Sequence, residues 1–179
     1  MEVQQLEKIK YPIGPFTRKD EYSPQELMQM IDVIEQAPAR YRTLVESLSD
    51  EDFKKLYRPG SWNVLQLVHH VADIQLLHLL RMKKALTEPD YNEVTLIDMD
   101  AWVTTPDALD APAEYSLHML ESITKRYVFL LRNLKEEELK ISYFHPVRKY
   151  SINQSQAINM SAWHLQHHLA HIEIALGRR

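Results

Sequence analysis

Apolar residues recur at helical spacing over four long segments of the chain. These segments run from 24 to about 48, from 62 to about 87, from about 112 to 134, and from about 153 to 176. The second segment is apolar on nearly every side, which predicts that it is buried among the others. The chain has only three glycines, and this also favours a helical protein because sheet folds usually need more turn glycine.

Several short motifs mark where the helices begin and end. The SPQE motif at 23–26 predicts a capping box with proline at the first helical position. Pro38 predicts a kink or a break in that helix, and Ser61 is the predicted N-cap of the second long helix. Residues 1–22 are predicted to form an extended N-terminal arm. Residues 88–111 are rich in Asp, Pro and Thr, which predicts a long crossover loop.

The two halves of the chain resemble each other. LSDEDFKK follows the first long helix, and the similar LKEEELKI follows the third. Each is followed by an irregular stretch and by a helix that carries a double histidine, in VHHVAD (68–73) and QHHLAH (166–171). This near-repeat predicts an all-α four-helix bundle in which His70 and His168 occupy equivalent inward positions on facing helices.

Composition limits the range of functions. A length of 179 residues predicts one domain, spanning 1–179. The net charge of −4 and the scattered basic residues argue against a nucleic-acid partner. The absence of a long apolar run predicts no membrane association and a cytoplasmic location. Because there is no cysteine, any metal ion must be held by histidine or carboxylate side chains.

Histidines concentrate in WHLQHHLAHI (163–172), which holds four of the nine in the chain. On a helical wheel, His164 and His168 are the pair nearest the apolar face, whereas His167 falls close to the opposite side. His164 and His168 are four residues apart and can chelate one ion. The second long helix offers His69 or His70 as a third ligand. The wheel does not choose between them, and only the near-repeat favours His70.

Three neutral imidazoles suit zinc, nickel or another borderline divalent ion and leave at least one coordination position open. An ion of this kind can acidify a bound water molecule, polarise a substrate or bind a thiolate. Imidazoles that bind metal usually donate their second N–H to an acceptor. Asp73 and Glu173 are the candidate acceptors.

Other conspicuous residues have simpler interpretations. A single H-x-x-x-H pair on a helix is more often made of surface or core histidines than of metal ligands. His78 and His118 stand alone and are predicted to be ordinary bundle residues. His145 is predicted to be structural, with a place in the site as the alternative. Trp62 and Trp163 are predicted to be core aromatics that could also wall a pocket.

Five motifs in order along the chain resemble the DinB-like superfamily, specifically its YfiT-type branch of metal-dependent hydrolases. They are YPIG (11–14), RPGSWNVLQLVHHVAD (58–73), Trp102, YFHP (143–146) and WHLQHHLAHI (163–172). The resemblance implies an up-down-down-up four-helix bundle with a long connection between the second and third helices. It covers nearly the whole chain.

The resemblance also implies a metal site. It makes His70, His164 and His168 the ligands of one zinc or nickel ion, and so chooses His70 over His69. Many relatives have Gln where His171 stands, so His171 is either an occasional extra ligand or a hydrogen-bond partner of a ligand. Homodimers are frequent in the family, and some relatives are thiol transferases that use bacillithiol, mycothiol or glutathione.

Three functions follow as hypotheses. The leading one is a hydrolase whose ion activates water against a small-molecule substrate. The alternative is a thiol S-transferase of the bacillithiol type, in which a low-molecular-weight thiol supplies the nucleophile that a chain without cysteine lacks. The third is a non-catalytic stress or scaffold protein in which the ion only ties two helices together.

Overall fold

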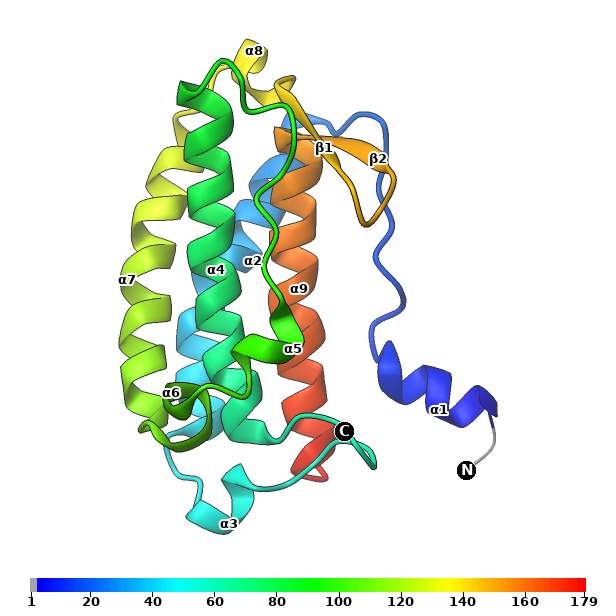
Figure 1. Ribbon diagram of the computed structural model, residues 1–179, viewed down its shortest axis with the longest axis vertical. Helices are drawn as coiled ribbons and strands as arrows, with labels where there is room; N and C mark the ends of the chain where they lie inside the picture. The colour runs from blue at the N-terminus through cyan, green and yellow to red at the C-terminus, as the bar shows by residue number, and fades with distance from the viewer. Residues whose placement is uncertain (1–2) are drawn as a thin grey trace.

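The computed structural model describes residues 3–179, with side chains from residue 5 onward. Four long helices form a bundle: α2 (Pro24–Val45), α4 (Val64–Thr87), α7 (Ala113–Arg132) and α9 (Gln154–Ala175). Each of α2 and α4 packs against both α7 and α9. Figure 1 shows that α4 and α7 run in one direction and α2 and α9 in the other, so the predicted up-down-down-up bundle is confirmed.

The bundle is held by one continuous apolar core. Ile34, Leu67, Leu120 and Ile158 come from the four different helices, and each is at most 1% exposed. Burial of side chains this large stabilises the fold by about 1.5–3 kcal/mol each. Since this core needs all four helices, the helices that carry the histidines are fixed relative to each other.

The two helices that carry the double histidines, α4 and α9, begin with the same capping arrangement. The Asn63 side chain accepts from the Gln66 backbone N–H, and the Gln66 side chain accepts from the Asn63 N–H. Asn153 and Gln156 do the same at the start of α9. The prediction of Ser61 as N-cap is therefore wrong, because Ser61 belongs to the preceding turn and its hydroxyl donates to the Trp62 carbonyl.

The first long helix contains Pro38 without interruption, so the predicted break does not occur. Proline removes one backbone hydrogen bond from a helix, which weakens it locally. The turns on either side of Pro38 bury Ile34 and Tyr41 in the bundle core. This packing holds the helix together across the missing bond.

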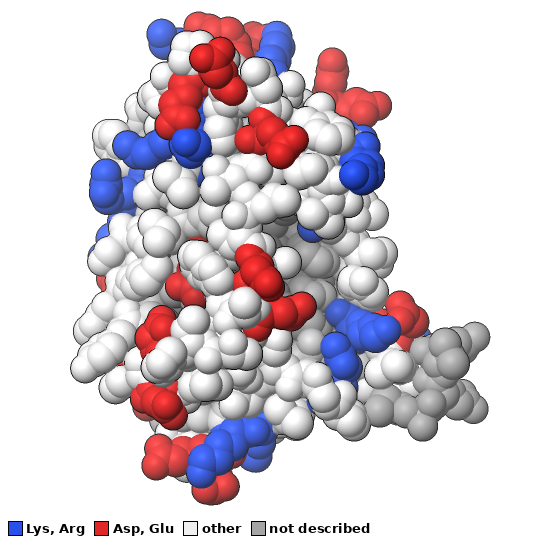
Figure 2. Space-filling view, in the orientation of Figure 1, with Lys and Arg blue, Asp and Glu red and all other residues white. Residues whose placement is uncertain are grey.

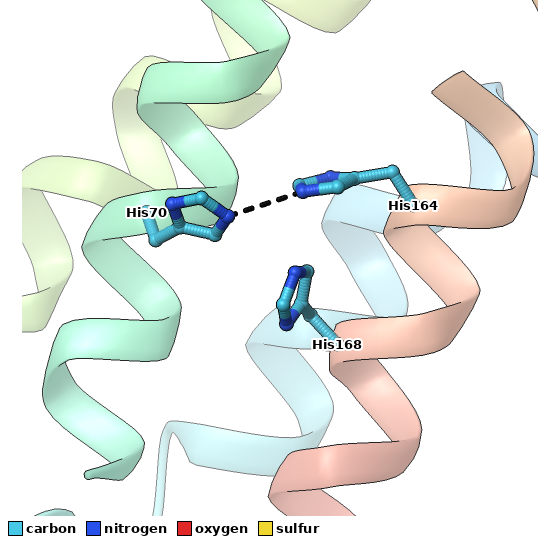
Figure 3. A group of neighbouring side chains, drawn as sticks. All are labelled: His70, His164 and His168. Atoms are coloured by element: carbon cyan, nitrogen blue, oxygen red, sulfur yellow. Dashed lines mark hydrogen bonds between the residues drawn. The ribbon is translucent and has the colours of Figure 1, made fainter. Parts of the chain in front are cut away.

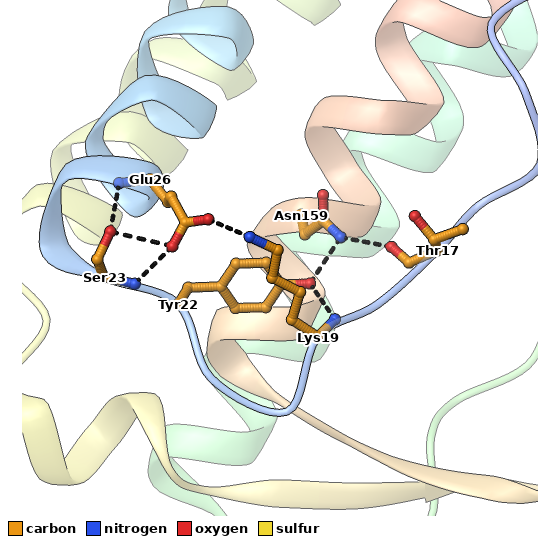
Figure 4. Close-up of polar contacts among 6 residues, drawn as sticks. All are labelled: Thr17, Lys19, Tyr22, Ser23, Glu26 and Asn159. Carbon is orange, nitrogen blue, oxygen red and sulfur yellow. Dashed lines mark hydrogen bonds and ion pairs between the residues drawn. The ribbon is translucent and has the colours of Figure 1, made fainter.

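The extended arm predicted at 1–22 is wrong at 3–10, where helix α1 (Val3–Lys10) packs against α9, and its first two residues lie outside the described residues. Lys8 and Lys10 lie in its last turn, where positive charge is favourable. The following segment is irregular and docks on the bundle, as Figure 4 shows: the Asn159 side chain on α9 donates to the Thr17 carbonyl and to the Tyr22 hydroxyl, both at 2.8 Å.

The crossover at 88–111 leads from the end of α4 along the bundle to the start of α7 (Figure 1). It is less irregular than predicted, because it contains two short helices, α5 (Met99–Trp102) and α6 (Pro106–Asp110). The Asp98 side chain caps α5 by accepting from a backbone N–H in its first turn.

Two further short helices, α3 (Asp50–Phe53) and α8 (Glu136–Leu139), lie in the two similar segments that follow the first and third long helices. A two-stranded antiparallel hairpin, β1 (Ser142–His145) and β2 (Tyr150–Asn153), was not predicted. The repeat is also out of register at the histidines. His70 follows the cap Asn63 by seven residues, whereas His168 follows Asn153 by fifteen, so the two positions are not equivalent.

Charges of both signs are interspersed on the face drawn in Figure 2, in keeping with the small net charge of −4. Among the described residues, no helix combines the length and apolar character that a bilayer crossing requires.

Candidate metal centre

His70 of α4 and His164 and His168 of α9 converge in the space between these two helices (Figure 3). One ring nitrogen of each lies within 4.8 Å of the others. The Nε2 atoms of His70 and His164 are 3.1 Å apart. The structure therefore brings together the three histidines of the predicted ligand set.

Helix geometry explains the convergence. His164 and His168 are one turn apart on α9, so their rings lie one above the other with centroids 4.5 Å apart. Because α4 runs antiparallel to α9, the early turns of α4 lie beside the late turns of α9. The ring of Trp62, just before α4, packs 4.7 Å from the ring of His70 and closes one side of the group.

The donor set fits a divalent ion of the zinc type. Two nitrogen ligands at ~2.0–2.1 Å from a tetrahedral zinc ion lie about 3.3 Å apart, close to the 3.1 Å between the two Nε2 atoms. Burial lowers the pKa of His70 to about 4 and holds the pKa values of His164 and His168 well below the ordinary value. The three imidazoles are therefore neutral near pH 7, with lone pairs available for a metal.

His171 orients one member of the group. Its Nε2 lies 3.1 Å from the Lys10 carbonyl oxygen, which can only accept, so this nitrogen carries the proton. Its Nδ1 then accepts from the Nδ1–H of His168 at 3.4 Å, a long contact. This leaves the lone pair of His168 on Nε2, the nitrogen that remains for a metal ion. Of the two roles considered for His171, the hydrogen-bond partner matches this geometry.

His69 is turned away from the group. Its Nδ1 accepts from the Ser116 hydroxyl at 2.7 Å, and its Nε2–H donates to the Ala111 carbonyl at 3.1 Å. Both ring nitrogens are thus used on the side of α4 that faces α7 and the crossover. The choice between His69 and His70, which the helical wheel left open, follows from which neighbouring helix covers each side of α4.

The two carboxylates proposed as acceptors lie elsewhere. Asp73 is half-buried, and burial and the negative charge of Asp107 raise its pKa to about 6. Within the described part of the chain it forms no hydrogen bond with an imidazole. Glu173 pairs with Arg179 at 3.3 Å. The acceptor for His168 is instead the neutral ring of His171.

The remaining single histidines differ in their surroundings. His118 is exposed and contacts Glu114 on the same helix. His145, at the end of β1, is buried and accepts from the backbone N–H of Arg148 at 3.4 Å. It is not part of the convergent group. His78 is buried in the bundle, and its ring lies 6.2 Å from that of His164.

His167 was placed on the outer side of the last helix by the helical wheel, yet it is only 7% exposed. The ring of Trp163 stacks on it at 4.3 Å, and Tyr11 lies beyond it at 6.1 Å. The N-terminal segment covers this side of α9. With His168 and His171, His167 forms a second group whose ring nitrogens lie within 4.8 Å of one another.

A pocket of about 440 Å³ opens on this region, in the size range of small-molecule sites. The end of α1, the turn before α4, α5 and the late turns of α9 all contribute to its wall. His168, a member of the convergent group, and Trp62, which packs against His70, both belong to this wall. The alternative considered for Trp62, that it walls a pocket, agrees with its position.

Known proteins resemble the chain over nearly its whole length. A protein of Oceanobacillus iheyensis is 39% identical over 169 residues, covering 94% of this chain and 96% of that protein. YfiT of Bacillus subtilis is 34% identical over 171 residues, covering 96% and 95%. Both are provisionally named as metal-dependent hydrolases.

Solved structures give the same picture. The structure of YfiT, provisionally described as a metal-dependent hydrolase with an unusual four-helix bundle topology, matches with a TM-score of 0.90 and 31% identity, over 96% of this chain and 99% of that one. A mycothiol-dependent maleylpyruvate isomerase shares the fold alone, with a TM-score of 0.52 and 16% identity over 85% of this chain and 67% of the other. The family model of the DinB superfamily matches residues 34–172, and the chain belongs to this superfamily.

Proposed function

We propose that the protein is a metal-dependent hydrolase of small molecules, and that His70, His164 and His168 hold one zinc or nickel ion. The observation that carries the proposal is the convergence of three neutral ring nitrogens from two rigid helices within 4.8 Å of one another. A divalent ion at such a site supplies Lewis acidity, which lowers the pKa of a water molecule that it binds.

The chain's own residues support this chemistry in three ways. His171 and the Lys10 carbonyl fix the orientation of His168. Trp62 restricts the movement of the His70 ring by packing against it. The pocket that His168 lines gives a small molecule a route to the group. Three protein ligands leave a tetrahedral ion one open position, as catalytic sites require.

Metal content tests the ligand assignment. The purified protein, dialysed after loading with zinc or nickel, is expected to retain one ion per chain by elemental analysis. His168→Ala is expected to lose most of it. His118→Ala is the matched control because His118 is an exposed histidine on a helix without ligands, and it is expected to retain the ion. Equal metal retention by both variants would contradict the assignment of His168 as a ligand.

Activity assays test the reaction. Metal-loaded protein is expected to hydrolyse a member of a panel of small esters and amides, and His168→Ala is expected to lose this activity together with its metal. A parallel assay offers low-molecular-weight thiols and a chromogenic electrophile. Thiol-dependent turnover without hydrolysis would contradict the proposed hydrolase activity and favour the thiol transferase. Retention of metal with neither activity would favour the non-catalytic scaffold.

A further inference from the structure

Arg58 lines the pocket that contains His168, and its guanidinium forms no ion pair within the part of the chain that the structure describes. Its Nε is fully buried and has no hydrogen-bond partner among the described residues. Its Nη1 makes only a long contact of 3.5 Å with the Pro59 carbonyl. A buried N–H of a guanidinium without an acceptor is costly, because charged donors lose strong hydrogen bonds to water. This arrangement is expected where a ligand supplies the missing acceptor.

The backbone holds Arg58 in place. The Ser61 N–H donates to the Arg58 carbonyl at 3.1 Å, and the Arg58 N–H donates to the Ser61 hydroxyl at 3.3 Å. Pro59 and Gly60 occupy the corner of this turn, and Gly60 has a φ of +73°, which disfavours any other residue. The RPGS turn therefore presents Arg58 from a fixed position only a few residues before α4.

Charge in the pocket is mainly positive or neutral. Lys10, the other cation of the wall, is paired with Glu7. Of the described residues that line the pocket, one is acidic. This residue, Asp100, forms no ion pair with Arg58. In Figure 2, basic side chains with an acidic one beside them lie where the bundle meets the N-terminal segment.

The other walls are aromatic. Tyr11, Tyr57 and Trp62 line the pocket, so the space between Arg58 and the histidines is bounded by flat apolar surfaces. A guanidinium binds planar oxyanions with two parallel N–H donors, and aromatic walls favour a flat or apolar body attached to that anion. The pocket volume of about 440 Å³ is in the range of pockets that bind small molecules.

We infer that Arg58 binds an oxyanion group, a carboxylate or a phosphate, of a small substrate with an aromatic or apolar body, and that it holds this substrate beside His168. This inference rests on the proposed function, because the bound molecule is a substrate only if the ion catalyses a reaction. It adds the chemical class of that substrate. Arg58 is a specificity-determining residue in this scheme, and the histidines hold the ion.

Binding of simple probes tests this role of Arg58. The zinc-loaded protein is titrated by NMR with benzoate, with phenyl phosphate and with the neutral benzamide. Benzoate or phenyl phosphate is expected to bind more tightly than benzamide, and whichever anion binds better identifies the oxyanion. In Arg58→Gln the Kd of that anion is expected to rise about 10-fold or more, because a charged hydrogen-bonded contact is lost. The Kd of benzamide is expected to stay unchanged.

Two controls keep the outcome clear. Arg126→Gln removes the same charge from an exposed position on α7, a helix that contributes no residue to the pocket wall, and should bind all probes as the unaltered protein does. Arg58→Lys keeps the charge without the planar fork and is expected to recover only part of the affinity. It also serves if Arg58→Gln folds poorly. An unchanged anion Kd in a folded Arg58→Gln, or no preference for an anion in the unaltered protein, would overturn the inference.

His70→Ala separates this inference from the proposed function. If Arg58 holds the anion, His70→Ala binds the better anionic probe even after its metal is lost. If the ion alone holds the anion, binding disappears in His70→Ala and persists in Arg58→Gln, which contradicts the role of Arg58. Metal retention by Arg58→Gln is measured in parallel, so a failure of the metal site is recognised independently of the anion site.

Discussion

The ring of Tyr57 lies nearly parallel to that of His171, with centroids 3.9 Å apart and an angle of 14° between the planes. The stack holds one face of His171, while its two nitrogens contact Lys10 and His168. Segments before α4, at the end of α1 and on α9 thus determine how one imidazole is oriented. The orientation of His168 depends on residues that are distant in sequence.

His171→Phe is expected to weaken zinc binding by ~10–100-fold, the usual effect of losing a hydrogen-bond partner of a metal ligand. Phenylalanine retains the stack on Tyr57 but can neither accept from His168 nor donate to Lys10. A competition titration with a chromogenic chelator measures the change in Kd. His171→Gln retains a polar side chain, and its zinc affinity is expected to lie between those of His171→Phe and the unaltered protein. Equal zinc affinity in His171→Phe and in the unaltered protein would contradict the orienting role.

Stability of the metal-free protein is expected to decrease as the pH falls below about 6.5, and His78 contributes to this decrease. Burial, aided by the charge of Arg81, lowers the pKa of His78 to about 3 from the ordinary histidine value of 6.5. Between these values the unfolded chain binds a proton that the folded chain does not. The free energy of unfolding therefore falls with decreasing pH, by up to about 1.4 kcal/mol per pH unit for this histidine.

Urea unfolding of metal-free protein at several pH values from about 4 to 7 measures that slope. His78→Leu removes the group that titrates, so its slope is expected to be shallower by up to about 1.4 kcal/mol per pH unit. His118→Gln, which replaces an exposed histidine, is expected to leave the slope unchanged. Identical slopes in His78→Leu and in the unaltered protein would show that the unfolded chain has no proton-binding advantage at this position.

Local signals in the sequence were sufficient for most of the bundle. The capping box at Ser23 and Glu26 depends only on residues three apart, so the predicted start of α2 is confirmed. Helical periodicity also identified the chelating spacing of His164 and His168. The hairpin was missed because its two strands have only four residues each. Part of its stability comes from the crossover, where Val94 donates to the Phe144 carbonyl at 2.9 Å.

The positions that the sequence did not resolve depend on packing between distant segments. His69 and His70 lie on a helix that is buried on nearly all sides, so no outward face distinguishes them. His167 lies on the outer side of α9 by helical geometry, but the N-terminal segment covers it. The periodicity of one helix contains no information on which distant segment packs against its outer side. The polar sequence of residues 3–10 gave little sign that a helix there would pack on α9.

Tyr41→Phe is expected to lower the free energy of unfolding by about 1 kcal/mol, the usual net contribution of a buried hydrogen bond. The Tyr41 hydroxyl donates to the Leu165 carbonyl at 2.7 Å and so joins α2 to α9. Its burial raises its pKa well above the ordinary value, so the hydroxyl stays protonated. Urea unfolding at neutral pH measures the change. A stability equal to that of the unaltered protein would mean that this bond adds nothing to the bundle.

Tyr127→Phe, in contrast, is not expected to lower the free energy of unfolding. Tyr127 is fully buried like Tyr41, but its hydroxyl has no hydrogen-bond partner among the described residues. Removing a buried unpaired hydroxyl avoids a desolvation cost of about 1–3 kcal/mol, so the free energy of unfolding is expected to stay the same or to rise. Urea unfolding beside Tyr41→Phe gives a matched comparison of two tyrosines with equal burial. A loss of stability as large as that of Tyr41→Phe would mean that the Tyr127 hydroxyl is hydrogen-bonded, for example to a buried water molecule.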